Sequence, residues 1–271
     1  MKKLKQILAI AAIVLILGMY AAAFVFSMMK SEAAQGLFRG AIGATILVPV
    51  LLYLFLMVAR AVKPVKSAVI DTIIFDAGFV LIDEPWEELA ASIGLTEEVT
   101  QAIGRDVMGR PEWAKFDRGE WTRDEAYAFF AGRVPGHEEE VMHFLETLDD
   151  CFVPYWYSED WIRSLKRKGY KVYILSNWSR ESHDFLVKKG VFDLVREADG
   201  AVWSYACGLA KPDPAIYEHL LRTYRIDPSR AVFLDDNPDN VAAARKCGIS
   251  AIRFRDYPDA EEKLASVGVR W

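Results

Sequence analysis

Three apolar, β-branched runs of this sequence end abruptly in residues that can do chemistry. The first ends at Asp76, the second at Ser176 and Asn177, and the third at Asp235 and Asp236. Taken alone, each could be an ordinary strand followed by a polar turn, because Asp, Asn and Gly are common turn residues. If the runs are parallel strands of one sheet, their carboxyl ends share an edge and these side chains converge.

Several carboxylates and a lysine in one place have a definite chemical use. Crowded carboxylates repel one another and resist ionisation unless a cation neutralises them. Oxygen ligands favour a hard ion, so Mg²⁺ is the expected metal. Lys211, in Lys-Pro-Asp-Pro just before an expected helix, and a Ser hydroxyl add donors for an anionic substrate. A carboxylate left free could act as the nucleophile, and the set describes metal-assisted phosphoryl transfer.

The elements that must position these residues alternate between strand and helix. Strands are expected over 72–76, 171–176, 201–203, 231–235 and 250–254, and helices over 160–168, 181–189, 214–224, 240–246 and 258–265. This alternation predicts right-handed βαβ units and a parallel sheet. The fold class is therefore α/β, with a Rossmann-like parallel sheet.

Residues 85–155 interrupt that alternation with several short helices and no strand. Thr96 is a candidate N-cap, and Thr122 to Glu125 has the pattern of a capping box. We expect a helical cap inserted into a core domain formed by residues 67–84 and 156–271.

The N-terminal residues 1–66 predict a two-helix transmembrane hairpin and a linker. Uncharged apolar runs cover residues 7–29 and 41–59, and the expected spans, about 7–29 and 41–61, are each long enough to cross a hydrocarbon core of about 30 Å. A cleaved signal peptide is the alternative for the first run, but its apolar core is too long and a second run follows. Lysine and arginine flank both outer ends, which favours cytoplasmic termini. The expected location is the inner or plasma membrane, as a multi-pass protein with a cytoplasmic catalytic domain.

Composition limits the remaining classes of function. The 271 residues carry a net charge of −5, which gives no electrostatic reason to expect nucleic-acid binding. Cys151, Cys207 and Cys247 are odd in number and far apart, which argues against a disulfide framework or a zinc site. The sequence leaves protein partners unknown.

Four short motifs, in order, resemble the signature motifs of the haloacid dehalogenase superfamily. They are Phe75-Asp76-Ala-Gly78, Leu175-Ser176-Asn177, Lys211-Pro-Asp-Pro214 and Phe233-Leu-Asp235-Asp236-Asn-Pro-Asp-Asn240. The resemblance covers about residues 70–255 and excludes the hairpin, and the helical insertion lies where that family carries its cap of the first type. The chain looks most similar to α-glucose-1-phosphatase-like members and to the phosphatase half of soluble epoxide hydrolases.

The resemblance implies a role for each motif residue. Asp76 would attack phosphorus, form an aspartyl-phosphate and ligate Mg²⁺, and the Gly78 carbonyl would add a ligand. Ser176 and the backbone at Asn177 would hold a phosphoryl oxygen, and Lys211 would balance charge between nucleophile and phosphate.

The fourth motif would complete the metal site. The resemblance implies that Asp236 binds the metal directly, and that Asp235 and Asn240 orient metal waters and neighbouring side chains.

One position departs from the superfamily pattern. Many members carry a second Asp two residues after the nucleophile as general acid and base, and here that residue is Gly78. The similar glucose-1-phosphatase group also has glycine there, so the change does not by itself end phosphatase activity. Asp83, Glu84 and His183 are candidates for a replacement, each with a structural role as the alternative.

We expect the residues after the Ser-Asn pair and the aromatic residues of the cap to have structural roles. We expect Trp178 and Arg180, which follow the Ser-Asn pair, to pack at the surface rather than to touch substrate. Trp113, Phe116 and Trp121 are expected to form the core of the cap rather than a sugar platform.

The expected function is a membrane-anchored, Mg²⁺-dependent phosphatase for a small phosphorylated metabolite, such as a sugar phosphate. A catalytically weak domain that serves as a membrane-bound binding or regulatory module is the alternative, motivated by Gly78. Hydrolytic dehalogenation also uses an Asp nucleophile, but its enzymes lack the paired carboxylates Asp235 and Asp236, which counts against it.

Overall fold

The computed structural model describes residues 69–271 without a gap, together with scattered helical positions between residues 18 and 57. The chain divides into two compact units, Met1–Ser67 and Ala68–Trp271. Most of the expected hairpin lies outside the described residues. Among the residues that are described, no helix has both the length and the apolar character needed to cross a membrane.

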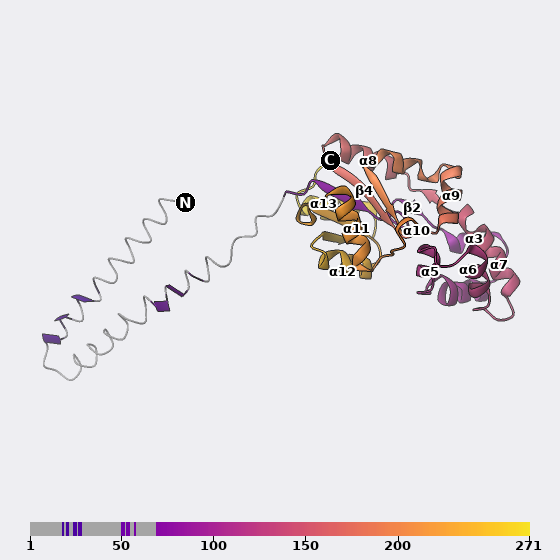
Figure 1. Cartoon of the computed structure of the whole chain (residues 1–271), viewed down its shortest axis with the longest axis horizontal. Coiled ribbons are helices and arrows are strands. Elements are labelled where there is room, and N and C mark those ends of the chain that lie inside the picture. Colours follow the sequence, from indigo (N-terminus) through magenta and orange to yellow (C-terminus); the bar gives the residue numbers. More distant parts are fainter. Residues whose placement is uncertain are drawn as a thin grey trace. The chain divides into compact units, whose positions relative to one another are not determined.

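A five-stranded parallel sheet forms the centre of the second unit, in the order β5-β4-β1-β6-β7 (Figure 1). The strands are β1 (Thr72–Phe75), β4 (Lys171–Ser176), β5 (Gly200–Trp203), β6 (Ala231–Asp235) and β7 (Ser250–Arg253). On β1, Phe75 lies opposite Ile174 of β4 on one side and Leu234 of β6 on the other. The central strands therefore end level with one another, which places the residues that follow them together.

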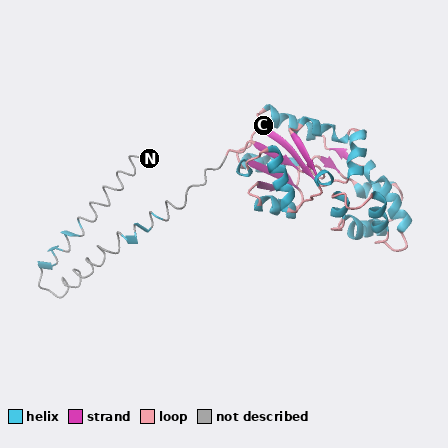
Figure 2. Ribbon diagram, viewed as in Figure 1, coloured by secondary structure: helices cyan, strands magenta, loops and turns pink. Residues whose placement is uncertain are grey.

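Helices cover both faces of this sheet (Figure 2). One face packs against α8 (Ser158–Arg167), α9 (Arg180–Lys189) and α13 (Tyr257–Ser266), and the other against α11 (Pro214–Tyr224) and α12 (Pro238–Lys246). Successive side chains of β1 alternate between the two cores, since Ile73 and Phe75 join the first and Ile74 joins the second. Both faces are buried, which explains why these strands are continuously apolar.

Shorter elements complete the core domain. They are η3 (Val191–Glu197), α10 (Ser204–Cys207) and η4 (Pro228–Arg230). The strands expected at 171–176 and 231–235 and the helix expected at 214–224 are confirmed at both ends. The predicted C-terminus of α9 is confirmed as well, because Gly190 follows it with a φ of 82°, in the left-handed region that glycine adopts without strain.

The insertion after β1 is helical. It contains α3 (Trp86–Ser92), α4 (Glu97–Ile103), the π-helical turn η1 (Gly104–Met108), α5 (Trp113–Asp117), α6 (Arg123–Ala131), α7 (Glu138–Thr147) and η2 (Leu148–Asp150). The Thr96 N-cap and the capping box between Thr122 and Glu125 are both confirmed. Two short antiparallel strands, β2 (Ile82–Asp83) and β3 (Val153–Pro154), pair where the chain leaves and re-enters the core domain, so the expectation of no strand within residues 85–155 is wrong at β3. They hold together the two ends of the cap.

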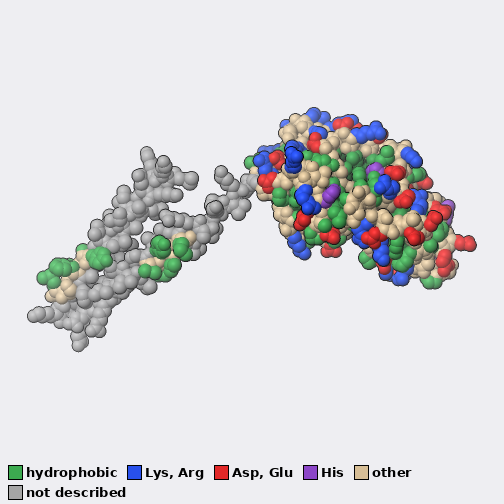
Figure 3. All heavy atoms as spheres, viewed as in Figure 1, with side chains coloured by type: hydrophobic (Ala, Val, Ile, Leu, Met, Phe, Trp, Pro, Cys, Tyr) green, Lys and Arg blue, Asp and Glu red, His purple; other side chains and the backbone are tan. Residues whose placement is uncertain are grey.

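Side chains of both charges are intermingled on the surface of this unit. On the face seen in Figure 3, Lys and Arg lie among Asp and Glu, and neither sign gathers into one stripe.

Candidate active site

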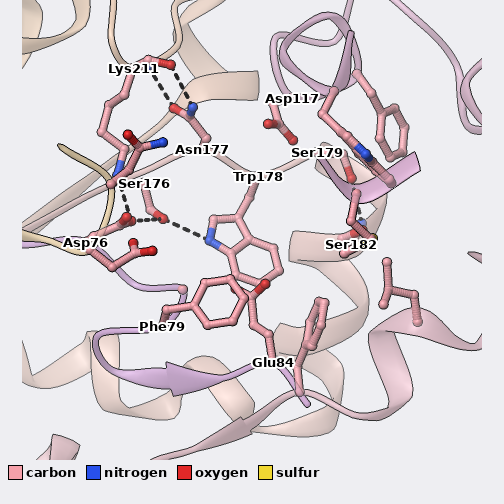
Figure 4. Close-up of a pocket in the computed structure, with 18 of the residues that line it drawn as sticks. Asp76, Phe79, Glu84, Asp117, Ser176, Asn177, Trp178, Ser179, Ser182 and Lys211 are labelled. Carbon is pink, nitrogen blue, oxygen red and sulfur yellow. Dashed lines mark hydrogen bonds and ion pairs between the residues drawn. The ribbon is translucent and has the colours of Figure 1, made fainter. Parts of the chain in front are cut away.

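The ends of the central strands meet in a pocket between the sheet and the cap (Figure 4). Asp76 follows β1, Ser176 ends β4, Asp236 follows β6, and Lys211 comes from the loop before α11. All four line the same cavity of about 360 Å³. The convergence predicted from the strand pattern is therefore present.

The two oxygens of Asp76 have different surroundings. Its Oδ1 accepts hydrogen bonds from the Ala77 amide at 2.7 Å and from the Ser176 hydroxyl at 2.6 Å, and it lies 2.7 Å from Lys211 Nζ. No group within residues 69–271 donates to its Oδ2. The carboxylate is thus held rigidly through one oxygen while the other remains available for reaction or for a metal.

Lys211 is buried between two carboxylates. Its Nζ lies 2.7 Å from Asp76 Oδ1 and 2.7 Å from Asp235 Oδ2, and only 1% of its side chain is exposed. Asn177 fixes the backbone of Lys211 from both sides, because its side chain accepts from the Lys211 amide at 2.9 Å and donates to the Lys211 carbonyl at 3.0 Å. The side chain of Asn177 therefore positions the lysine (Figure 4).

The paired carboxylates of the fourth motif have separate surroundings. Both oxygens of Asp235 are occupied, by Lys211, by the Asn237 amide and by the side chain of Asn240 at 3.0 and 3.1 Å. Within residues 69–271, no side chain donates a hydrogen bond to the carboxylate of Asp236, which interacts only with its own backbone amide and that of Asn237. The carboxylate of Asp236 can thus bind a ligand, whereas that of Asp235 is fully engaged.

The donor set fits a divalent metal. One carboxylate oxygen from each of Asp76, Asp235 and Asp236 lies within 4.8 Å of the others. Because Asp235 is already engaged, Asp76 and Asp236 are the two that would contact an ion. Oxygen donors with few protein ligands suit Mg²⁺, which keeps several of its waters.

The electrostatics of the pocket also call for a cation. Burial raises the pKa of Asp76 to about 8, repulsion from Asp235 and Asp236 adds to the rise, and the Lys211 ammonium opposes it. Burial and the neighbouring Asp235 likewise raise the pKa of Asp236. Burial alone would lower the pKa of Lys211, but its attraction to Asp235 and Asp76 prevails and raises it. The site is short of positive charge, although it holds one protonated lysine.

The structure separates the three candidates for the missing acid. Asp83 accepts a hydrogen bond from the Tyr155 hydroxyl at 3.1 Å and does not line the pocket. His183 packs on Phe192 and Trp203 and does not line the pocket. Glu84 lines the pocket, and burial together with repulsion from Asp76 and Asp236 raises its pKa well above the usual value.

The structural interpretation of Trp178 is wrong. This residue is buried and lines the pocket, where its indole Nε1 donates to the Ser176 hydroxyl at 2.9 Å. A tryptophan directly after the polar end of a buried strand was the available signal. Its amide donates to Ser204 Oγ at 2.8 Å, and that hydroxyl lies 2.8 Å from the Asp117 carbonyl of the cap. Trp178 therefore lines the pocket wall and connects Asp76, through Ser176, with the cap.

The cap and the loop after β1 supply the remaining walls. Apolar side chains from both form most of them, namely Phe79, Met108, Trp113, Phe116, Leu148 and Phe152. Trp113 and Phe116 thus belong to the cap core and to the pocket wall together. Phe79 has a φ of 55°, which is rare for a bulky residue, and its amide donates to the Ile82 carbonyl at 2.8 Å. This tight turn directs the chain from Asp76 to β2.

Asp117 at the end of α5 adds a half-buried carboxyl to the wall. Burial raises its pKa to about 7, and Lys211 and Arg118 oppose the rise. Between about pH 4 and pH 7 the folded chain then binds more protons at this residue than the unfolded chain, so the free energy of unfolding falls as pH rises. We expect Asp117→Asn to flatten that fall when urea unfolding is measured across this range.

An exposed aspartate of the cap provides the control. Asp124→Asn should leave the pH slope of the wild-type chain unchanged. Equal slopes for Asp117→Asn and the wild type would contradict a raised pKa at Asp117.

Comparisons with known proteins place this site in a family. Residues 70–248 match the model of the haloacid dehalogenase-like hydrolases. A sesquiterpene phosphatase of Aspergillus oryzae is 26% identical over 184 residues, covering 68% of this chain and 89% of the relative. A D-ribitol-5-phosphate phosphatase of Bacteroides thetaiotaomicron is 24% identical over 211 residues, covering 73% and 98%. The bifunctional epoxide hydrolase 2 of Rattus norvegicus is 35% identical over 107 residues, 38% of this chain but only 19% of that enzyme.

Solved structures agree on the fold. A crystal structure of a HAD family enzyme of Bacteroides thetaiotaomicron is 25% identical and matches with a TM-score of 0.51, covering 68% of this chain and 93% of that one. That enzyme in complex with magnesium and inorganic phosphate matches with a TM-score of 0.52 at 23% identity, covering 70% and 98%. The family match spans both the strand ends and the helical cap, and the chain belongs to the haloacid dehalogenase-like hydrolases.

Proposed function

We propose that this chain is a Mg²⁺-dependent phosphatase that hydrolyses a small phosphorylated metabolite through an aspartyl-phosphate. The observation that carries the proposal is the state of Asp76, which three donors hold through Oδ1 while Oδ2 is left open to the pocket. The relatives named as phosphatases support the reaction class. The magnesium and phosphate complex of the Bacteroides thetaiotaomicron enzyme supports the cofactor.

Each of the polar residues in the pocket has a separate role in the reaction. Asp76 attacks phosphorus, and Lys211 offsets the negative charge that nucleophile and phosphate bring together. Ser176 turns its hydroxyl from Asp76 toward a phosphoryl oxygen, and Trp178 holds that hydroxyl in place. A metal held by Asp76, Asp236 and the Gly78 carbonyl would neutralise the phosphoryl oxygens and orient the phosphate. Water then releases phosphate from Asp76.

The lining of the pocket indicates what kind of ester fits. Lys211 is the only basic residue among the lining residues, and it already faces two carboxylates. Substrates with a second anionic group are therefore disfavoured, because Glu84, Asp117 and Asp149 also line the pocket. A neutral leaving group is favoured, such as a sugar, a polyol or an apolar alcohol.

We also propose that the N-terminal residues tether this enzyme to a membrane, with the catalytic unit in the cytoplasm. The uncharged runs support this, as do the exposed apolar side chains of Phe24, Met28 and Tyr53 in the first unit. A reporter fused after Trp271 should be active only in the cytoplasm. A reporter that reads on the outer side of the membrane would refute the orientation.

The reaction is tested with the purified full-length chain. Phosphate release is measured from D-ribitol 5-phosphate, glucose 1-phosphate, a sesquiterpenyl phosphate and p-nitrophenyl phosphate, with Mg²⁺ and with EDTA. We expect release from at least one ester that EDTA lowers by about 100-fold or more. Release from none of them, or release that EDTA leaves unchanged, would contradict the proposal and favour a binding or regulatory module.

A further inference from the structure

The space beside Gly78 is filled by another residue. A β-carbon built on Gly78 would overlap the Glu84 Oε1 atom and would lie 3.2 Å from Glu84 Cδ. The carboxyl of Glu84 therefore occupies the volume that a side chain at position 78 would need. The structure thus puts the Glu84 carboxyl beside residue 78, the second residue after Asp76, although residue 78 itself carries no carboxyl.

Glu84 is delivered there by the short strand at the base of the cap. It follows β2, and its carbonyl accepts from the Trp86 amide at 2.8 Å at the start of α3. Asp83 pairs with Val153 of β3 and binds Tyr155 through its side chain. Since successive side chains of a strand point to opposite sides, Glu84 is turned into the pocket while Asp83 is turned away.

No structural contact among the described residues accounts for the position of the Glu84 carboxyl. It lies among the pocket residues around Trp178 and Phe79 (Figure 4). No donor in the 69–271 unit forms a hydrogen bond or ion pair with it. Ser176 and Lys211, by contrast, are both bonded to Asp76. Glu84 is therefore the free acid group nearest in the chain to the nucleophile loop.

We propose that Glu84 is the general acid and base of this site, and that its carboxyl replaces the side chain absent at Gly78. The proposal rests on the phosphatase function proposed above. An alcohol is a poor leaving group unless its oxygen receives a proton as the bond to phosphorus breaks. A carboxyl beside Gly78 stands next to the nucleophile loop and faces the same cavity, which is where such a proton must be supplied.

Glu84 alone accounts for the proton that is transferred in each of the two half-reactions. Asp76 forms a bond to phosphorus as the ester P–O bond breaks, and the Glu84 proton moves to the departing oxygen to give the alcohol. The Glu84 carboxylate then takes a proton from water while the water oxygen attacks phosphorus. This releases Asp76 and inorganic phosphate and returns the proton to Glu84.

Leaving-group dependence distinguishes this role from a structural one. Glu84→Gln in the full-length chain is compared with the wild type on p-nitrophenyl phosphate, whose phenolate departs without a proton, and on the best alkyl phosphate. We expect kcat/KM, which reports the first half-reaction, to fall by about 10²- to 10⁴-fold on the alkyl ester and by less than about 10-fold on the nitrophenyl ester. The second half-reaction is common to both esters, so kcat should fall on both. Equal losses of kcat/KM on both esters, or no loss, would overturn the proposal.

Moving the carboxyl back to position 78 provides a second test. Gly78→Asp in the wild type must displace the end of the Glu84 side chain, whereas Gly78→Asp combined with Glu84→Ala has room for the new side chain. We expect the double variant to recover at least about 10-fold of the alkyl-ester activity lost in Glu84→Ala. A double variant that folds with the wild-type Tm but recovers no activity would count against the proposal.

Two neighbouring carboxyls serve as matched controls. Asp83→Asn, outside the pocket, should keep both activities within about threefold of the wild type. If Asp117→Asn shows the selective loss on the alkyl ester and Glu84→Gln does not, the acid is Asp117 and the proposal is wrong. If the wild type releases phosphate from neither ester, the phosphatase function fails first, and the role of Glu84 fails with it.

Discussion

Replacing Asp76 with asparagine should lower phosphate release by about 10⁴-fold or more, because the attacking atom is lost. An amide oxygen is a far weaker nucleophile than a carboxylate. The variant also loses half of the negative charge that Lys211 faces at 2.7 Å. The Ser176 and Ala77 donors remain, so the loss reflects the chemistry rather than a collapsed site.

Two measurements make this result specific. After brief mixing with substrate and an acid quench, the wild-type chain should carry covalently bound phosphate, and Asp76→Asn should carry none. Asp71→Asn is the matched control, because Asp71 precedes the other end of β1 and pairs with Arg230 at the surface. It should retain activity within about threefold. Wild-type activity in Asp76→Asn would mean that another residue attacks phosphorus.

The prediction from sequence that these residues converge is confirmed, because parallel sheets have a simple geometry. Once the apolar runs ending at Asp76, Ser176 and Asp235 are strands of one sheet, their ends must meet. Lys211 could be added because it directly precedes a helix that packs on the same sheet. Backbone periodicity alone carried these inferences, and it is strongly encoded in buried parallel strands.

The sequence could not predict in the same way which side chains of the short connecting segments point into the pocket. Asp83 and Glu84 are adjacent carboxyls, and only the pairing of β2 with β3 decides which one enters the pocket. That pairing joins residues on either side of the whole cap. The orientation of Trp178 depends similarly on Ser204, a distant residue that has no motif around it. Such contacts depend on how the cap docks, which local patterns do not encode.

Lys211→Met should produce the largest loss of stability in this unit. Lys211 is the cation between the buried carboxylates of Asp76 and Asp235, and methionine fills its volume without its charge. Removing one partner of a buried ion pair leaves charge uncompensated, which costs about 3–5 kcal/mol. We expect this decrease in the free energy of unfolding at pH 7 with EDTA, measured by urea denaturation. Activity should be lost as well.

The cause of the lost stability in Lys211→Met can be tested with conditions that should restore it. Without Lys211, the buried carboxylates bind protons more readily when folded than when unfolded, so stability should recover as pH falls. Mg²⁺ should also restore stability, because an ion that binds only the folded site shifts the equilibrium toward it. A simple packing defect would respond to neither change.

A surface lysine separates the effect of position from the effect of charge. Lys188 is exposed on α9, so Lys188→Met should change the free energy of unfolding by less than about 0.5 kcal/mol. If Lys211→Met is equally mild at pH 7 in EDTA, the ammonium of Lys211 does not stabilise the folded chain by offsetting the charge of the buried carboxyls. The electrostatic reason for a magnesium ion beside Asp76 and Asp236 would then disappear as well.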